Sequence, residues 1–181
     1  GTGEPVVLDP VAVGATAYRR QAVRAVLDAV RVAVVRGNAS EILFLAGEEA
    51  RSRGVDSLEG SGQAVEAAGR LARELSAVVC VSGARDVATD GRSAWLVDNG
   101  HPMMPLVTGL GCTATALIGA FAAVNPDPLL ATVHAMAVLG LAGEMAARRA
   151  KGPGSLQVGI YDALHALGPE DLASGLQVTR P

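Results

Sequence analysis

The chain has 181 residues, enough for one domain with a hydrophobic core, and half of them are hydrophobic while only 3% are aromatic. A core of this composition is built from Val, Leu, Ile and Ala, as in layered α/β proteins. The formal net charge of -3 argues against a basic nucleic-acid-binding protein and a polybasic membrane-binding one. Apolar runs are broken by charge or glycine before the roughly 20 residues that a membrane span needs. We therefore expect a soluble domain with neither a nucleic-acid nor a membrane partner.

Elements in the first half of the chain alternate between strand and helix. A short apolar strand is predicted at 5–8, and a second at 32–35. Between them, Thr16 or a neighbour caps a helix whose apolar face is Val23, Val26, Leu27 and Val30. Ser40 is predicted to cap the next helix, residues 51–62 form a surface loop rich in Gly, Ser and charge, and 63–75 form an amphipathic helix.

The second half begins with strands and ends with helices. A strand is predicted at 78–81, followed by a hairpin of 87–89 and 94–97 around an Asp-Gly turn. Helices are predicted at about 113–124, 127–150 and 155–167, with a break at 152–154. The tail from Gly168 is expected to be loosely held.

All-apolar strands that alternate with helices predict a parallel sheet covered on both faces. Ligands gather at the carboxyl ends of the strands in such sheets. Polar features follow these strand ends: Asp9, Arg36, Asn38, Ser82 and the glycine turn that begins at Gly109. Five independent polar features at one rim favour a binding site there.

The glycine turn Gly109-Leu110-Gly111 leads directly into an apolar helix with Cys112 in its first turn. Unpaired amides and the positive end of the helix dipole make such a turn an anion site, and phosphate is its usual ligand. Glycine lets the backbone approach the ligand closely or adopt positive φ. The same dipole favours the thiolate form of a cysteine in that position. By itself the pattern is as consistent with a mere tight turn.

The two cysteines, Cys80 and Cys112, lie in different kinds of element and are expected to be free thiols. Free thiols are typical of a reducing compartment, which favours the cytoplasm. The first residues lack the charged and apolar regions of a signal peptide.

Six segments, read in order, resemble hydroxyethylthiazole kinases, a thiamine-salvage family of the ribokinase-like superfamily: LDPVAVGAT, VVRGNASEI, VSGARD, NGHPMM, VTGLGC and KGPGSLQV. The resemblance extends from Pro5 to about Leu167. It implies one kinase domain over 1–181 with a ribokinase-like (Rossmann-like), mostly parallel sheet and helices on both faces. It also implies ATP-dependent phosphorylation of the hydroxyl of 4-methyl-5-(2-hydroxyethyl)thiazole, with Mg²⁺ as cofactor.

The resemblance assigns the metal to an Asn-x-x-Glu motif, here Asn38 to Glu41, which helps to hold Mg²⁺ and its waters near the phosphates. Asp9 is expected to assist the metal shell. Mg²⁺ keeps several waters and is bound through few carboxylates, so this small set suffices. Read without the resemblance, Glu41 is a first-turn helix residue that the dipole favours.

Cys112 stands where most ribokinase-like kinases have an aspartate that receives the proton of the attacking hydroxyl, and thiazole kinases resemble this chain in having cysteine there. By the same resemblance Arg36 and Ser82 contact ATP, although threonine is usual at the position of Ser82. Either hydroxyl donates to phosphate.

Gly109 and Thr108 are expected to lie against the thiazole alcohol. The amides from Gly109 through Gly111 to Cys112 are expected to receive the transferred phosphoryl charge.

The chain also departs from the family that it resembles. The family usually has glycine at the position of Ala12, threonine at that of Leu110 and phenylalanine at that of Leu156. The family begins well before the strand at 5–8, with a segment that supplies further strands and part of the thiazole pocket. We therefore expect an N-terminally truncated kinase domain. The family's homotrimer, with active sites between subunits, is the expected assembly.

Three alternatives remain open: a hydroxymethylpyrimidine or pyridoxal kinase, a more distant nucleotide-repair dehydratase, and a non-catalytic fragment that binds nucleotide. Cys112 disfavours the first two, for which aspartate is expected. His101, His134 and His165 are expected to be structural, because no second metal ligand is suitably spaced. The segment Gly152–Ser155 matches the family without an assigned role.

Overall fold

The computed structural model describes residues 3–48 and 58–181, with only the backbone of 58–61. Within these residues, six strands form one sheet in chain order. The first three strands are parallel and the pairings from β3 onward are antiparallel. The strands are β1 (Val7–Leu8), β2 (Val34–Asn38), β3 (Val78–Ser82), β4 (Asp86–Thr89), β5 (Ala94–Val97) and β6 (Val178–Thr179).

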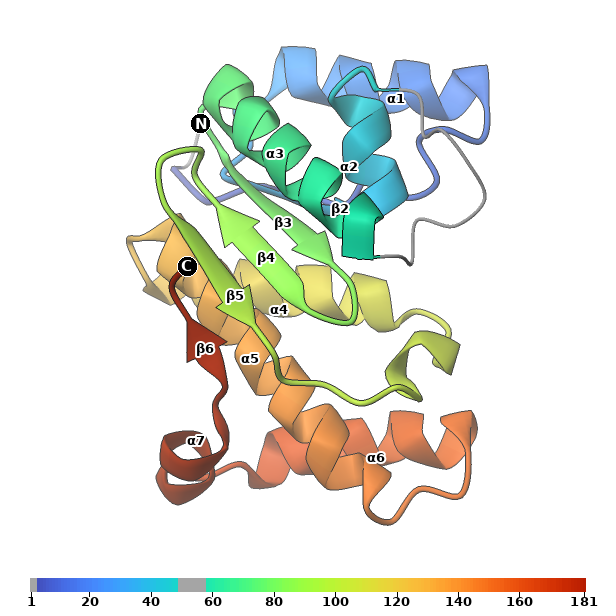
Figure 1. Ribbon diagram of the computed structural model, residues 1–181, viewed down its shortest axis with the longest axis vertical. Coiled ribbons are helices and arrows are strands. Elements are labelled where there is room, and N and C mark those ends of the chain that lie inside the picture. The colour runs from blue at the N-terminus through green and yellow to red at the C-terminus, as the bar shows by residue number, and fades with distance from the viewer. Residues whose placement is uncertain (1–2, 49–57) are drawn as a thin grey trace.

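Helices cover both faces of this sheet, which confirms the α/β fold (Figure 1). On one side lie α1 (Ala17–Ala29), α2 (Ala39–Leu45) and α3 (Leu58–Leu75), and on the other α4 (Leu110–Val124), α5 (Pro128–Ala147) and α6 (Pro153–Ala166). Strand residues alternate between the two cores: Val34 and Val78 face the α4–α6 side, whereas Val35 and Val79 face α2 and α3. The sheet is more mixed than predicted, since two of its five pairings are parallel.

β2 begins and ends later than the strand predicted at 32–35. Residues 36–38 pair in register with residues 80–82 of β3, and this pairing carries the strand past the apolar run. The predicted Ser40 cap of α2 is wrong. Asn38 is the N-cap, its side chain accepting from the amide of Glu41, and the Ser40 hydroxyl donates to Asn38.

Three further predictions on the helices have mixed outcomes. Thr16 caps α1, as predicted. The apolar face predicted for α1 is only partly covered: Leu27 packs against the core, whereas Val26 and Val30 are exposed. Residues 58–62, predicted as loop, belong to α3, while 51–57 lie outside the described residues.

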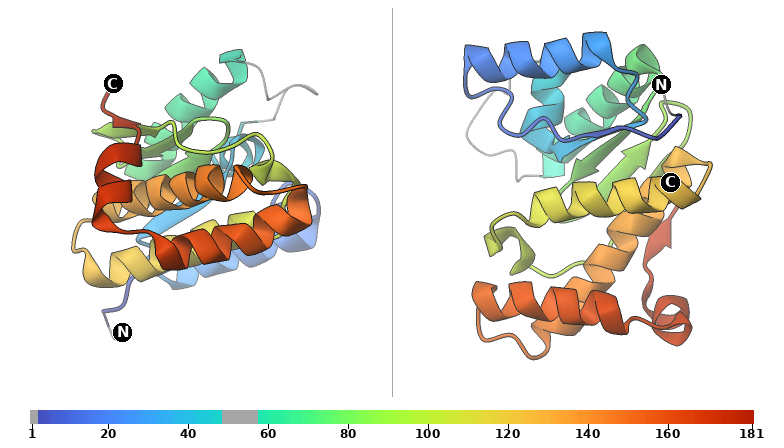
Figure 2. Two further views of the ribbon diagram at one scale, coloured as in Figure 1. Left: turned by 90° about the horizontal axis from the view of Figure 1, so that it is seen from below. Right: turned by 180° about the vertical axis from the view of Figure 1, so that it is seen from behind.

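The tail is not loosely held. It forms α7 (Pro169–Gly175) and then β6, which pairs with β5 through Thr179 opposite Leu96. Figure 2 shows α7 and β6 returning from the end of α6 to the edge of the sheet. Sequence reasoning missed β6 because two residues carry no periodic pattern, and their conformation depends on the edge that they join.

α5 is long and apolar enough to cross a membrane by length and composition, contrary to the expectation that every apolar run is too short. However, 72% of its most apolar window is buried inside the protein. It packs between α4 and α6 and against the sheet, so it is a core helix.

Candidate active site at the carboxyl ends of the parallel strands

Three of the predicted rim residues meet at the ends of neighbouring strands. Asp9 follows β1, Arg36 lies in β2 and Ser82 ends β3. The Nη2 of Arg36 donates to Oγ of Ser82 at 2.6 Å, and its Nη1 lies 3.4 Å from Oδ2 of Asp9. The side chains of Arg36 and Asp9 are each only 13% exposed. The parallel pairing of the three strands therefore assembles a nearly buried cation at the rim.

The Arg36 guanidinium also lies against the first turn of α4. A Cβ added to Gly111 would lie only 2.6 Å from Nη1 of Arg36, so this approach requires glycine. The Nε of Arg36 is buried and has no hydrogen-bond partner among the described residues. A buried donor without an acceptor costs free energy unless a ligand or water supplies one.

The first turn of α4 presents further unsatisfied donors. Gly109 is the N-cap with φ of +83°, a left-handed conformation that favours glycine, and it supplies no capping side chain. The first bond of the helix runs from the amide of Thr113 to the carbonyl of Gly109. Among the described residues, the amides of Gly111 and Cys112 have no acceptor. The predicted anion site therefore has the expected backbone geometry.

Cys112 is exposed and lines an open pocket of about 400 Å³ between β1 and α4. Asp9 lines the same pocket, so the predicted thiol and the predicted metal-shell carboxylate face one space. The pocket face of α4 follows helical spacing from Cys112. The lining residues are Pro5, Val7, Asp9, Cys112, Thr115, Ala116 and Gly119.

Asn38 and Glu41 form a reciprocal capping box at the start of α2. The Oε2 of Glu41 accepts from the amide of Asn38 at 2.9 Å, and Oε1 accepts from the amide of Ala12 at 2.8 Å. Ala12 has φ of +50°, which explains why glycine suits this position. Asn38 and Glu41 therefore have a structural role at the start of α2.

Asp86 was not singled out from the sequence, although it lies beside the rim. It is 9% exposed, and its Oδ1 accepts from the amide of Gly83 at 2.9 Å. Burial raises the pKa of Asp86 to about 7, against smaller lowering contributions from the Gly83 amide and the Arg36 charge. Burial, with the nearby Asp86 charge, also raises the pKa of the Cys80 thiol, which makes Cys80 an inert core residue.

Further residues singled out from the sequence lie in turns or at the start of a helix. Thr108 is exposed in the turn before Gly109 and makes no side-chain hydrogen bond among the described residues. Nδ1 of His101 accepts from the amide of Met103, in a structural turn. The described part of the chain contains no group of three His, Cys, Asp or Glu side chains that could hold a metal. Oγ of Ser155 accepts hydrogen bonds from the amides of Lys151 and Gly152. These bonds fix the start of α6.

Thr115 is the second residue that sequence reasoning missed. Its Oγ1 lies 2.8 Å from Oδ2 of Asp9, across a sequence separation of 106 residues. Its position three residues after Cys112 could have indicated that Thr115 faces the same space as Cys112, because residues three apart share a helix face.

Comparisons with known proteins identify the family of the chain. Residues 1–170 match the model of the hydroxyethylthiazole kinase family. A hydroxyethylthiazole kinase of Granulibacter bethesdensis is 61% identical over 165 residues, which are 91% of this chain and 60% of that protein. One from Desulfotalea psychrophila is 49% identical over 174 residues, which are 96% of this chain and 64% of that protein.

Solved structures extend the comparison to the fold. A hydroxyethylthiazole kinase protein from Pyrococcus horikoshii is similar with a TM-score of 0.87 and 38% identity, over 98% of this chain and 65% of that one. A pyridoxal kinase from Staphylococcus aureus, 19% identical with a TM-score of 0.63, shares the fold over all of this chain and 64% of its own. The chain thus spans less than two thirds of the length of these relatives. The matched residues and the 61% identity show that this chain belongs to the hydroxyethylthiazole kinase family.

Proposed function

We propose that this protein transfers the γ-phosphoryl group of ATP to the hydroxyl of 4-methyl-5-(2-hydroxyethyl)thiazole, a step of thiamine biosynthesis or salvage. Membership of the family supports the reaction and its substrate. The observation that carries the proposal is the convergence of Arg36 and the free amides of Gly111 and Cys112 beside an exposed thiol. Such a site offers hydrogen-bond donors to a phosphoryl group and a base to the attacking alcohol.

The donor set fits a nucleotide phosphate. A guanidinium and backbone amides are donors only, and the buried Nε of Arg36 requires an acceptor. Phosphate oxygens supply acceptors of the right charge. Arg36, together with the Ser82 hydroxyl that it contacts, is therefore proposed to hold the phosphates of ATP.

The metal set fits Mg²⁺ held through its waters. Each carboxylate oxygen of Glu41 already accepts one backbone amide, and Oδ1 of Asn38 accepts two donors, so the capping box leaves few lone pairs for direct coordination. Mg²⁺ ordinarily retains several waters, which suits contacts of this kind. Asp9, Asn38 and Glu41 are proposed to hold it, and when bound it neutralises charge on the phosphates.

In the proposed mechanism, the Cys112 thiolate receives the proton of the thiazole hydroxyl. Cys112 lies in the first turn of α4, where it is exposed and lines the pocket together with Asp9. Gly109 and Thr108 position the alcohol, while the amides of Gly111 and Cys112 donate to the transferred group. A weak base is tolerable, because the loose transition state of phosphoryl transfer depends mainly on positioning and charge.

A second candidate function is nucleotide binding without turnover. Its basis is the donor set alone, because the Nε of Arg36 and the amides of Gly111 and Cys112 suit phosphate oxygens whether or not an alcohol is bound. Under this alternative, ATP binds and the thiazole does not.

A coupled ADP-release assay on the 181-residue chain separates the two candidates. We expect turnover of ATP that depends on the thiazole alcohol and on Mg²⁺. Calorimetric titrations of ATP and of the thiazole, each by itself, accompany the assay. ATP binding without thiazole binding or turnover would favour the second candidate, and pyridoxal or hydroxymethylpyrimidine turnover in place of thiazole turnover would favour a relative of different specificity.

The assembly is proposed to be a homotrimer in the cytoplasm. Exposed apolar side chains support self-association: Val158 and Tyr161, 61% and 50% exposed, lie one turn apart on α6. Light scattering after size exclusion tests this directly. A mass near that of three 18.3 kDa chains is expected, and a monomer at micromolar concentration would contradict it.

A further inference from the structure

Thr115 is a pocket-lining hydroxyl for which the proposed mechanism has no role. It follows Cys112 by three residues on α4, and both side chains line the pocket with Asp9. Its Oγ1 lies 2.8 Å from Oδ2 of Asp9 and 3.1 Å from the carbonyl oxygen of Gly111. The two acceptors therefore compete for one hydroxyl proton.

The carboxylate is the stronger acceptor of the two. A threonine inside a helix usually donates to the carbonyl four residues earlier, which here is that of Gly111. Oδ2 of Asp9 is both closer and negatively charged, and charge-assisted hydrogen bonds are the stronger ones. Thr115 therefore donates to Asp9 and ties the residue after β1 to the first turns of α4.

The same carboxylate oxygen also faces Arg36. Oδ2 of Asp9 lies 3.4 Å from Nη1 of Arg36, so Thr115 and Arg36 share one oxygen. No described residue donates a side-chain hydrogen bond to Oδ1 of Asp9. Thr115 thus fixes which carboxylate oxygen faces the guanidinium and which is left for a ligand.

We propose that Thr115 is a positioning residue of this site: its hydroxyl orients the Asp9 carboxylate, which in turn holds the Arg36 guanidinium against Gly111 in the first turn of α4. The effect on turnover rests on the proposed kinase function. The orientation of Asp9 by Thr115 does not, because it is a property of the unliganded site.

The test compares variants that separate the hydroxyl from the shape of the side chain. Thr115→Val keeps the branched shape and removes the hydroxyl, whereas Thr115→Ser keeps the hydroxyl. Thr132→Val is the matched control, because Thr132 is buried in α5 and donates to the carbonyl of Pro128, four residues earlier. We expect Thr115→Val to lower kcat about tenfold with the thiazole KM changed less than about threefold.

Thr115→Ser is expected to restore kcat to within about threefold of the wild type, and Thr132→Val to leave it unchanged. The double variant Asp9→Asn with Thr115→Val should be no slower than Asp9→Asn alone, since both act through one carboxylate. A wild-type kcat for Thr115→Val, no recovery with serine, or additive losses in the double variant would each overturn the proposal.

A wild-type chain that shows no thiazole-dependent turnover would contradict the proposed function without deciding the role of Thr115. Urea unfolding of the wild type, the two single variants Asp9→Asn and Thr115→Val, and the double variant then tests the contact itself. Non-additive losses in the free energy of unfolding support the coupling of Thr115 to Asp9. Additive losses overturn it.

Discussion

Two polar clusters near the strand ends differ in how completely their hydrogen bonds are satisfied. The cluster around Arg36 leaves the buried Nε of Arg36 and the amides of Gly111 and Cys112 without acceptors among the described residues. It also borders an open pocket. Its donors are therefore available to a ligand.

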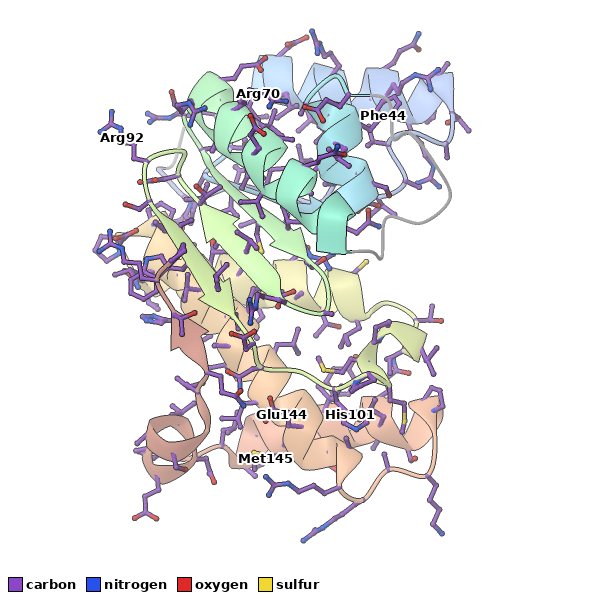
Figure 3. All side chains as sticks on the ribbon, viewed as in Figure 1. Phe44, Arg70, Arg92, His101, Glu144 and Met145 are labelled. Carbon is purple, nitrogen blue, oxygen red and sulfur yellow. The ribbon has the colours of Figure 1, made fainter. Side chains whose placement is uncertain are left out.

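The cluster around Asn99, which follows β5, is closed. Nδ2 of Asn99 donates to Oε1 of Glu144 and to the carbonyl of Gly175, and its Oδ1 accepts from the amide of Gln177 at 2.7 Å. Glu144, labelled on α5 in Figure 3, also accepts from the amide of Gly100. These bonds fasten the C-terminal tail to α5 and to the loop after β5.

This difference distinguishes the candidate binding site from a network that stabilises the fold. Buried donors without acceptors cost free energy, so they are retained where a ligand supplies the acceptors. A fully satisfied network stabilises the fold and offers a ligand no free group. Changes in the Asn99 cluster should therefore alter unfolding, and changes in the Arg36 cluster should alter binding and turnover.

The largest effect on stability is expected from Asn99→Ala. It removes three hydrogen bonds from a buried side chain that is 5% exposed, and Glu144, Gly175 and Gln177 each lose that partner. We expect the free energy of unfolding in urea to fall by about 3 kcal/mol, with ADP affinity unchanged. Asn125→Ala, at a half-buried residue whose side chain accepts one amide, is the control and should cost less than about 1 kcal/mol. Equal losses in the two variants would contradict the distinction.

The next largest effect is expected from Cys112→Ser, measured as kcat in the ADP-release assay. A hydroxyl is a poorer base than a thiolate, so turnover should fall about 100-fold without vanishing. Cys112→Asp should retain or raise turnover, because a carboxylate serves the same proton transfer. The melting temperature should stay unchanged in both variants, since Cys112 is exposed. Wild-type kcat in Cys112→Ser would remove Cys112 from the mechanism.

Gly111→Ala tests the approach of Arg36 to α4. The new Cβ would lie 2.6 Å from Nη1 of Arg36, so the guanidinium must move. We expect ADP affinity by calorimetry to fall about tenfold, equivalent to about 1.4 kcal/mol. Gly69→Ala on α3 is the matched control, because its Cβ would lie an ordinary 3.6 Å from Nη1 of Arg73. An unchanged affinity in Gly111→Ala would show that the position of the guanidinium is unimportant.

Asp86 extends the comparison to a buried acid beside the rim. Its pKa is raised from 3.8 to about 7, so between these values the folded chain binds more protons than the unfolded chain. Stability should therefore fall as pH rises from 5 to 8. In Asp86→Asn this fall should be smaller by on the order of 1 kcal/mol. Urea unfolding of the wild type and of Asp86→Asn at the two pH values measures this difference. An equal loss of stability in both proteins would contradict the raised pKa of Asp86.

The smallest effect is expected from Ala12→Gly. Ala12 has φ of +50°, a conformation that costs a residue with a Cβ roughly 1 kcal/mol, while glycine loses more entropy on folding. The two contributions nearly cancel, so stability should change by less than about 0.5 kcal/mol. Ser76→Gly, at the other described non-glycine residue with positive φ, is the control. A large loss in Ala12→Gly, as measured by thermal unfolding, would show that the side chain itself matters.

Much of the candidate site could be predicted because its signals are local. The helix start at Gly109 and Cys112 follows from glycine before an apolar helical pattern, and the structure has the left-handed φ and the exposed thiol there. The meeting of Asp9, Arg36 and Ser82 follows from the parallel order of three apolar strands. The catalytic and binding roles of these residues remain predictions.

The sequence by itself determined five of the six described strands, most helices and the rim at which polar residues gather, because backbone preferences and apolar periodicity act over a few residues. Tertiary structure decided that the tail forms β6, that Gly111 admits Arg36, and that Thr115 reaches Asp9 from 106 residues away. These contacts depend on sheet pairing and on the packing of α4 against β1. No local pattern encodes the distance between side chains that only the folded chain brings together.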